Sequence, residues 1–361
     1  MAINERLIDT EVAAAAAAVD TDNLMLDLDA SDVDSYDGDG DVWYDIHDFE
    51  YKPTTNVAEN FNTVLYNGQE TPLSVTGVGF TPDLVWIKNR TLTFVPVLYD
   101  SVRGTGNTKA IYSSETNAQG SNPDNQNLSS FDLDGFTLGD TQNGGTNIIR
   151  TGASNDYVAW CFKAGGASVT NTNGDIDSQV SVNNDLGFSI VKYSGGNSSG
   201  TTVGHGLDVP PELIITKNIS ASSSWPVFVT GGIPMGSSTF TLQGSSQYLG
   251  LNSNTGFISY TLDKQFGGSA NSGSSSQDII SYCFTSKRGV SKVGSYTGDG
   301  GTSNRIYTGF EPAFVLQKRT DNTSNWRIFD NVRGTEKELY ANTSAQEPAN
   351  VAYIDFNRDG F

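Results

Sequence analysis

Short apolar runs, separated by Gly, Asn, Ser and Asp, recur along the chain from residue 60 onward. Such runs are typical of β-strands joined by tight turns. One layout occurs three times: a proline, one variable residue, four mostly apolar or β-forming residues, and a lysine. It starts at Pro82, Pro211 and Pro312. Proline at the first position of a strand removes no ladder hydrogen bond, so each copy predicts a strand. Recurrence predicts a repeated structural unit.

Two further motifs mark the beginning of each unit and a turn within it. A strand ending in tyrosine is predicted before each proline, at Tyr66, Tyr193 and Tyr296. Asp134-Gly135-Phe136 matches Asp359-Gly360-Phe361, with a weaker relative at 255–257, and predicts a turn.

The closing strand is predicted in only two of the three units. Trp160-Cys161-Phe162 and Tyr282-Cys283-Phe284 occupy the same place in successive repeats. The third repeat stops at Phe361, before such a strand. We therefore expect a fragment of a longer protein, or a last strand that comes from elsewhere.

These patterns predict an all-β protein with tandem β-sandwich repeats and a short N-terminal α-helix. A β-solenoid is the rival, but its repeat is usually shorter than the roughly hundred residues found here. The predicted segments are an anchoring helix, an acidic strand and linker segment, and three sandwich repeats, the third incomplete. Their ranges are 1–22, 23–59, 60–168, 169–289 and 290–361.

Two segments of the N-terminal part each allow two interpretations. Residues 4–19 are rich in alanine and predict a helix, which is either a frayed tail or an anchor packed against a partner subunit. Asp37, Asp39 and Asp41 could supply oxygen ligands to calcium. The spacing does not fit an EF-hand, and Asp with Gly also forms turns without an ion, so a solvated turn is favoured.

Charge narrows the choice of partners. The net charge is −20, and residues 1–60 hold 16 acidic side chains against Arg6 and Lys52. Nucleic-acid binding is disfavoured because phosphate contacts need clustered basic residues, and anionic membranes are disfavoured for the same reason. The longest apolar run, residues 12–19, is far shorter than the roughly 20 residues of a membrane span.

Candidate binding residues are few. Asp100 with Arg103, and Asp330 with Arg333, recur at the same offset and could bind a charged sugar. An ion pair within each repeat is the favoured interpretation, because the motif recurs.

Tryptophan side chains divide into two predicted groups. Trp86 and Trp160 lie in the most apolar strands and are predicted to be core, as are the thiols of Cys161 and Cys283. Trp225 and Trp326, flanked by Ser and Asn, are expected to be partly exposed and are weak candidates for stacking on a ligand.

The chain offers little for catalysis. The two histidines, His47 and His205, lie in no motif of a nucleophilic triad or a zinc site. A glycosidase needs two carboxylates, for which Asp100, Asp132 and Asp134 are candidates. Because the Asp134 position recurs at Asp359, a turn is favoured. We predict no enzymatic activity and no required cofactor, and calcium is the one candidate cofactor.

Residues 60–361 resemble the repeats of large structural proteins of tailed bacteriophages. The motifs that carry this resemblance are GFTPDLVWIKNR, YDSVRG, SFDLDGF and YVAWCFKAGG. The segment 23–46 is similar to the opening of concanavalin A-like (laminin-G-like) sandwiches, which implies a jelly-roll type of sandwich. Repeat two departs from the pattern by lacking the Asp and Arg of YDSVRG.

The resemblance implies a virion structural protein, assembled in the host cytoplasm. The favoured role is a tail fibre or tail-associated appendage that docks by its N-terminus. Expected partners are other phage virion proteins, further copies of the chain, and a host surface glycan or protein. The alternatives are a capsid decoration protein and a glycan-degrading depolymerase.

Overall fold

The computed structural model describes a large part of one compact unit, Pro53–Phe361. The described ranges are 57–69, 72–121, 128–139, 155–195, 202–229, 240–241, 265–267, 277–300, 304–319, 324–348 and 354–361. The predicted anchoring helix 1–22, the acidic segment as far as residue 56, and the calcium candidates Asp37, Asp39 and Asp41 lie outside these ranges.

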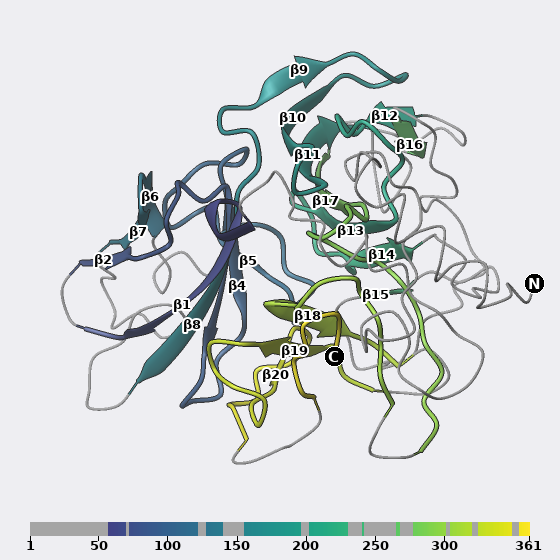
Figure 1. Ribbon diagram of the computed structural model, residues 1–361. Helices are drawn as coiled ribbons and strands as arrows, with labels where there is room; N and C mark the ends of the chain where they lie inside the picture. Colours follow the sequence, from purple (N-terminus) through teal and green to yellow (C-terminus); the bar gives the residue numbers. More distant parts are fainter. Residues whose placement is uncertain are drawn as a thin grey trace, which may run out of the picture. The chain divides into compact units, whose positions relative to one another are not determined.

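The fold is all-β, as predicted. Within the described ranges the one helical element is the short 3-10 turn η2 (Val57–Glu59), and the paired strands run antiparallel. The strands can be followed in Figure 1.

The first repeat forms a five-stranded sheet and a three-stranded sheet. Their orders are β1-β8-β3-β4-β5 and β2-β7-β6. The strands are β1 (Phe61–Asn67), β2 (Leu73–Thr76), β3 (Leu84–Asn89), β4 (Val97–Asp100), β5 (Ile111–Tyr112), β6 (Leu128–Asp132), β7 (Gly135–Leu138) and β8 (Asp156–Phe162). Side chains of both sheets, such as Val85 and Cys161 from one and Phe136 from the other, form one buried core. The layering is therefore sandwich-like.

The second repeat reproduces this strand order. Its sheet runs β15-β14-β13-β17-β11-β10-β9, with β12-β16 as a separate pair. The order β11-β17-β13-β14-β15 corresponds to β1-β8-β3-β4-β5, and β10 and β9 extend the β11 edge. The strands are β9 (Val169–Asn171), β10 (Ser178–Asn183), β11 (Phe188–Ser194), β12 (Thr202–Gly204), β13 (Leu213–Asn218), β14 (Pro226–Val229), β15 (Phe240–Thr241), β16 (Gln265–Gly267) and β17 (Asp278–Phe284).

The third repeat contributes one small sheet. It runs β18 (Phe314–Gln317), β19 (Arg327–Asp330), β20 (Leu339–Tyr340), and this order corresponds to β3-β4-β5. The prediction of a strand that ends at Tyr296 is wrong, because residues 292–299 form no strand. The reason is visible in the first repeat, where β1 takes its ladder partner from β8. No described residue of the third repeat supplies a strand of that kind.

The closing strands β8 and β17 are buried on both faces. Along β8, Tyr157, Ala159 and Cys161 face the core of their own repeat. The alternate residues, Trp160 among them, enter a second core. Cys283 lies in the corresponding core of the second repeat, so the prediction of two separate buried free thiols is confirmed.

One hydrophobic core is shared by all three repeats. It contains Trp86 and Phe162 of the first repeat, Phe188 of the second, and Ile328 of the third. The Phe162 ring packs against rings of the other repeats, with centroids 5.6 Å from Phe188 and 5.8 Å from Phe314. The outer faces of the larger sheets are therefore covered by neighbouring repeats.

Candidate functional site

The recurring Asp and Arg form a buried turn at the end of a strand. Asp100 is the last residue of β4, and its carboxylate accepts hydrogen bonds from the Arg103 backbone N at 2.8 Å and Nε at 2.5 Å. Asp330, at the end of β19, makes the same two contacts with Arg333 at the same distances. All four residues are buried, so neither pair is open to a sugar carboxylate.

Each pair also receives a hydrogen bond from the closing strand of another repeat. The indole Nε1 of Trp160 donates to Asp330 Oδ2 at 2.9 Å. The hydroxyl of Tyr282 donates to Asp100 Oδ2 at 2.7 Å. Trp160 and Tyr282 occupy the same position in β8 and β17. We call each aromatic–Asp–Arg set a clasp, and the clasps join repeat one to repeat three and repeat two to repeat one.

The second repeat has lost the carboxylate of its clasp. Leu84 pairs with Asp100 between β3 and β4, and the corresponding Leu213 pairs with Val229 between β13 and β14. Val229 therefore stands at the position of the acid.

A buried lysine makes a second contact at each junction. Lys88 Nζ donates to Ser344 O of the third repeat at 3.1 Å, and Lys217 Nζ donates to Thr116 O of the first repeat at 2.8 Å. Both lysine side chains are fully buried. Desolvation lowers the pKa of each ammonium group to about 7. Carbonyl acceptors from two repeats hold the lysine in place of water.

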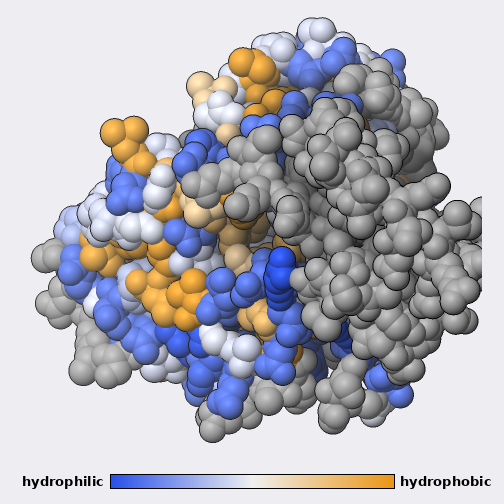
Figure 2. Space-filling model, in the orientation of Figure 1, coloured by the Kyte–Doolittle hydropathy of each residue, from blue (hydrophilic) through white to orange (hydrophobic). Residues whose placement is uncertain are grey.

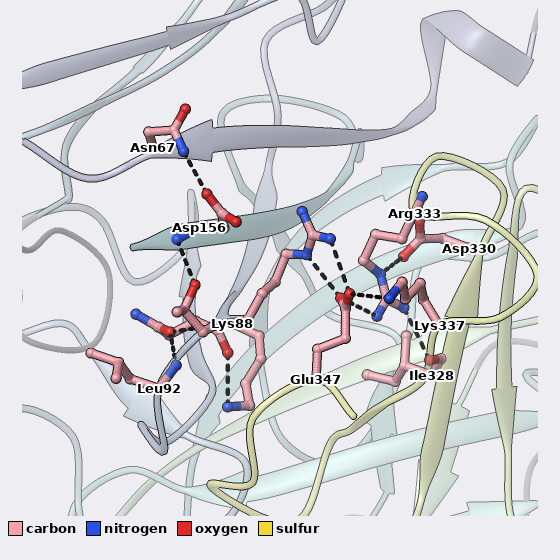
Figure 3. A network of polar contacts seen from close by, with 12 residues as sticks. Asn67, Lys88, Leu92, Asp156, Ile328, Asp330, Arg333, Lys337 and Glu347 are labelled. Carbon is pink, nitrogen blue, oxygen red and sulfur yellow. Dashed lines mark hydrogen bonds and ion pairs between the residues drawn. The ribbon is translucent and has the colours of Figure 1, made fainter. Parts of the chain in front are cut away.

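An ion-pair network adds charge to the junction of repeats one and three (Figure 3). Glu347 Oε2 lies 2.8 Å from Arg90 Nε of the first repeat and 3.4 Å from Nη1 of Arg333. Burial opposes ionisation of Glu347, but the hydrogen bonds and charges of Arg90 and Arg333 together outweigh it, so the pKa of Glu347 is lowered.

At the junction of repeats one and two, uncharged side chains occupy the positions of this ion pair. Glu347 N donates to Arg90 O at 2.8 Å, and Gln119 N donates to Ile219 O at 3.1 Å. The backbone contact is thus the same at both junctions, while the side chains differ.

Trp225 and Trp326 were predicted to be partly exposed, and this is wrong. Trp225 is 0% and Trp326 5% exposed, and both belong to the shared core. Trp225 Nε1 donates to Tyr112 O and Glu115 O of the first repeat, each at 3.0 Å. Ser223, a polar neighbour of Trp225 in sequence, belongs to a junction between repeats, where its backbone N donates to Thr116 O, and a local pattern does not distinguish such a junction from a solvent-exposed surface. Trp86 and Trp160 are buried, as predicted.

The carboxylates considered for glycosidase chemistry have structural partners. Asp134 accepts from the backbone N of Gly77 at 3.1 Å and of Gly79 at 2.6 Å, and these bonds lower its pKa. Asp132 accepts from Thr137 Oγ1 at 2.7 Å. Asp100 lies in its clasp, so each of the three carboxylates is already engaged by a structural contact.

Other features that could carry chemistry are sparse in the described ranges. His205 is buried, and its Nδ1 accepts from Leu207 N at 3.1 Å. Among described residues no three His, Cys, Asp or Glu gather as a metal site, and none of the helical structure there could cross a membrane. One pocket of about 590 Å³ opens between Asp177, Gln179 and Lys192. On the face in Figure 2, hydrophobic patches alternate with hydrophilic residues.

These features define the chain as an all-β protein whose repeats are joined through buried polar clasps and a shared core. A family model described as a domain of unknown function, DUF7483, matches residues 56–361, and the chain belongs to this family. No curated protein and no solved structure matches the chain.

The clasps are the part of this site that sequence reasoning missed. Two signals pointed to them. The Asp-Arg pair and the aromatic residue before the cysteine are each present in two repeats, and both recur at fixed offsets. Their connection was hidden because the partners lie in different repeats, with Trp160 and Asp330 separated by 170 positions.

Proposed function

We propose that this protein is a structural component of a tailed-phage virion, with tandem sandwich repeats of the jelly-roll, concanavalin A-like type. The observation that carries the proposal is the use of the recurring charged residues. Asp100, Arg103, Asp330 and Arg333 are buried between repeats rather than directed into a cavity. This is what a rigid display scaffold needs, and it leaves no reactive group of the motif for catalysis.

Within the virion, a tail fibre or tail-associated appendage is the favoured place. The support is the resemblance of residues 60–361 to phage structural repeats, together with the alanine-rich segment 4–19, which suits an anchor. The appendage docks by its N-terminus and presents the repeats to a host surface glycan or protein. A capsid decoration protein is the second candidate, since it too is built from acidic β modules.

Cryo-EM of particles carrying a tagged copy tests the assignment. Density of the repeats on the tail is expected, whereas density on capsomers favours decoration, and absence from particles overturns the virion role. A particle with residues 1–22 deleted from this protein is the matched test of the anchor. Incorporation is expected to fail, and normal incorporation contradicts docking by the helix.

The absence of catalysis has its own assay. Incubation with host polysaccharide is expected to give no shortening of the glycan. Turnover that disappears on substitution of one aspartate, for example Asp132→Asn, would establish a depolymerase instead.

A further inference from the structure

Among the described residues, the sheet of the third repeat has an open edge where the sheets of the other two repeats have a strand. In the first repeat β3 lies between β4 and β8, and in the second β13 lies between β14 and β17. Within the described ranges β18 pairs with β19 and forms the edge of its sheet. The open edge is therefore the place of a closing strand.

Burial gives the same result independently. β3 is buried along its whole length, with Leu84 2% and Trp86 4% exposed, whereas every residue of β18 is only partly buried. Tyr193 of the second repeat is 2% exposed, and its counterpart Tyr296 is 43% exposed. Both walls of the gap, β18 and the segment of Tyr296, lack the cover that their counterparts have.

Around this gap, several contacts of the third repeat match those of the first repeat. The rings of Tyr296 and Phe361 meet at 6.2 Å and 79°, and those of Tyr66 and Phe136 meet at 6.2 Å and 78°. Gly360 forms a bridge with Tyr307, as Gly135 does with Thr76. The side chains of Gln317 and Tyr296 also share a hydrogen bond across the gap. The described residues of the third repeat therefore keep several contacts of the first repeat on either side of the position that β8 occupies there.

We propose that the open edge of β18 binds a β-strand supplied by a partner polypeptide. The strand runs antiparallel to β18 and between β18 and the segment of Tyr296. It completes the third repeat, and an extended peptide added to a sheet edge is a known mode of recognition. This inference does not depend on the virion role.

The chemistry of the partner strand follows from β8 and β17. Both are apolar on two faces because they separate the core of their own repeat from the shared core. Each is already paired on both edges, β8 with β1 and β3 and β17 with β11 and β13, so neither is spare in a second copy. The register of β3 with β8, in which Leu84 faces Phe162 and Trp86 faces Trp160, places aromatic residues opposite Phe314 and Leu316.

The lost clasp of the second repeat refines this chemistry. By the arrangement that brings Trp160 to Asp330 and Tyr282 to Asp100, the corresponding partner residue meets the position of Val229. A valine offers no acceptor. The partner is therefore expected to carry an aromatic residue without a donor, such as phenylalanine, at that position.

Hydrogen exchange of the full chain with a synthetic peptide tests the proposal. The peptide copies residues 155–163 with Trp160→Phe, and a control peptide also carries Ala159→Pro, which cannot pair on both edges. Exchange of the β18 amides and of residues 293–296 is expected to slow by at least about tenfold with the first peptide only. The unmodified Trp160 peptide is expected to bind more weakly than its phenylalanine form. Tighter binding of the Trp160 peptide would contradict the inference that the position of Val229 offers no acceptor.

Two results would overturn the strand site itself. One is β18 amides that already exchange as slowly as those of β3 without peptide, because another part of the chain would then cover the edge. The other is slowing at the edge strand β9 instead of β18. As matched protein variants, Leu316→Asp should abolish the protection, and Val169→Asp on the exposed edge of β9 should leave it unchanged.

Discussion

At the scale of single residues, the chain uses buried polar groups to fix which side chains meet. A buried carboxylate is costly unless paired and hydrogen-bonded. Asp330 satisfies this need with Arg333 from its own turn and with Trp160 from another repeat. The guanidinium of Arg333 also lies 5.5 Å from the centre of the Trp160 ring, where a cation is favourable. The clasp thus combines an ion pair, a hydrogen bond and ring packing in one place.

Loss of the indole donor should weaken the clasp measurably. Trp160→Phe removes the hydrogen bond to Asp330 and is expected to lower the free energy of unfolding by about 1–3 kcal/mol more than loss of ring area alone. Trp86→Phe is the matched control, because Trp86 packs against Trp160 with centroids 6.0 Å apart and its Nε1 has no hydrogen-bond partner in the described structure. Chemical denaturation measures both variants. Equal losses would contradict a stabilising clasp.

At the scale of elements, the glycine of the Asp-Gly-Phe turn permits β7, which begins at this turn, to lie close to its ladder partner β2. Gly135 has φ +149°, and a Cβ there would lie 2.0 Å from Val75 O. Gly360 would meet Ile306 O at 1.9 Å in the same way. The repeated motif therefore reflects backbone geometry, since any side chain would separate β2 from β7.

Adding one methyl group at this crossing should destabilise the first repeat. Gly135→Ala is expected to cost about 1–3 kcal/mol, because the strands must move apart to make room. Gly298→Ala is the control, since a Cβ at Gly298 meets nothing within 4 Å. Thermal unfolding compares the two. A neutral Gly135→Ala would show that the crossing does not need glycine.

At the scale of the whole molecule, the stability of the repeat junctions should depend on pH through the buried lysines. Burial lowers the pKa of Lys88 and Lys217 to about 7, whereas an unfolded lysine titrates near 10.4. Between about pH 7 and 10 the unfolded chain therefore binds more protons, and the free energy of unfolding rises with pH. Below about pH 7 both states are protonated and this contribution becomes constant.

Lysine variants isolate this contribution. As pH rises from about 7 to 10, the free energy of unfolding of the unsubstituted protein is expected to increase relative to that of Lys88→Met. Lys318→Met is the matched control, because Lys318 is partly exposed and donates to Arg319 O beside it. Denaturant unfolding across the range measures the difference. A constant difference would contradict neutralisation of Lys88 in the folded state.

The sequence by itself determined the local elements. Apolar periodicity and turn residues predicted the all-β fold, the buried cysteines, and the strands β3, β13 and β18, although each of these strands begins two residues after the proline and not at it. These succeed because a strand and the face it buries depend on neighbouring residues.

The tertiary structure decided which side chains are exposed to solvent. Trp225, Trp326 and Lys88 are covered by other repeats, and the strand predicted at Tyr296 lacks its partner. Such outcomes rest on contacts between segments far apart in sequence, for example Lys88 with Ser344, which no local pattern encodes. The same long-range packing turned a repeated Asp-Arg motif into the clasp that joins one repeat to the next.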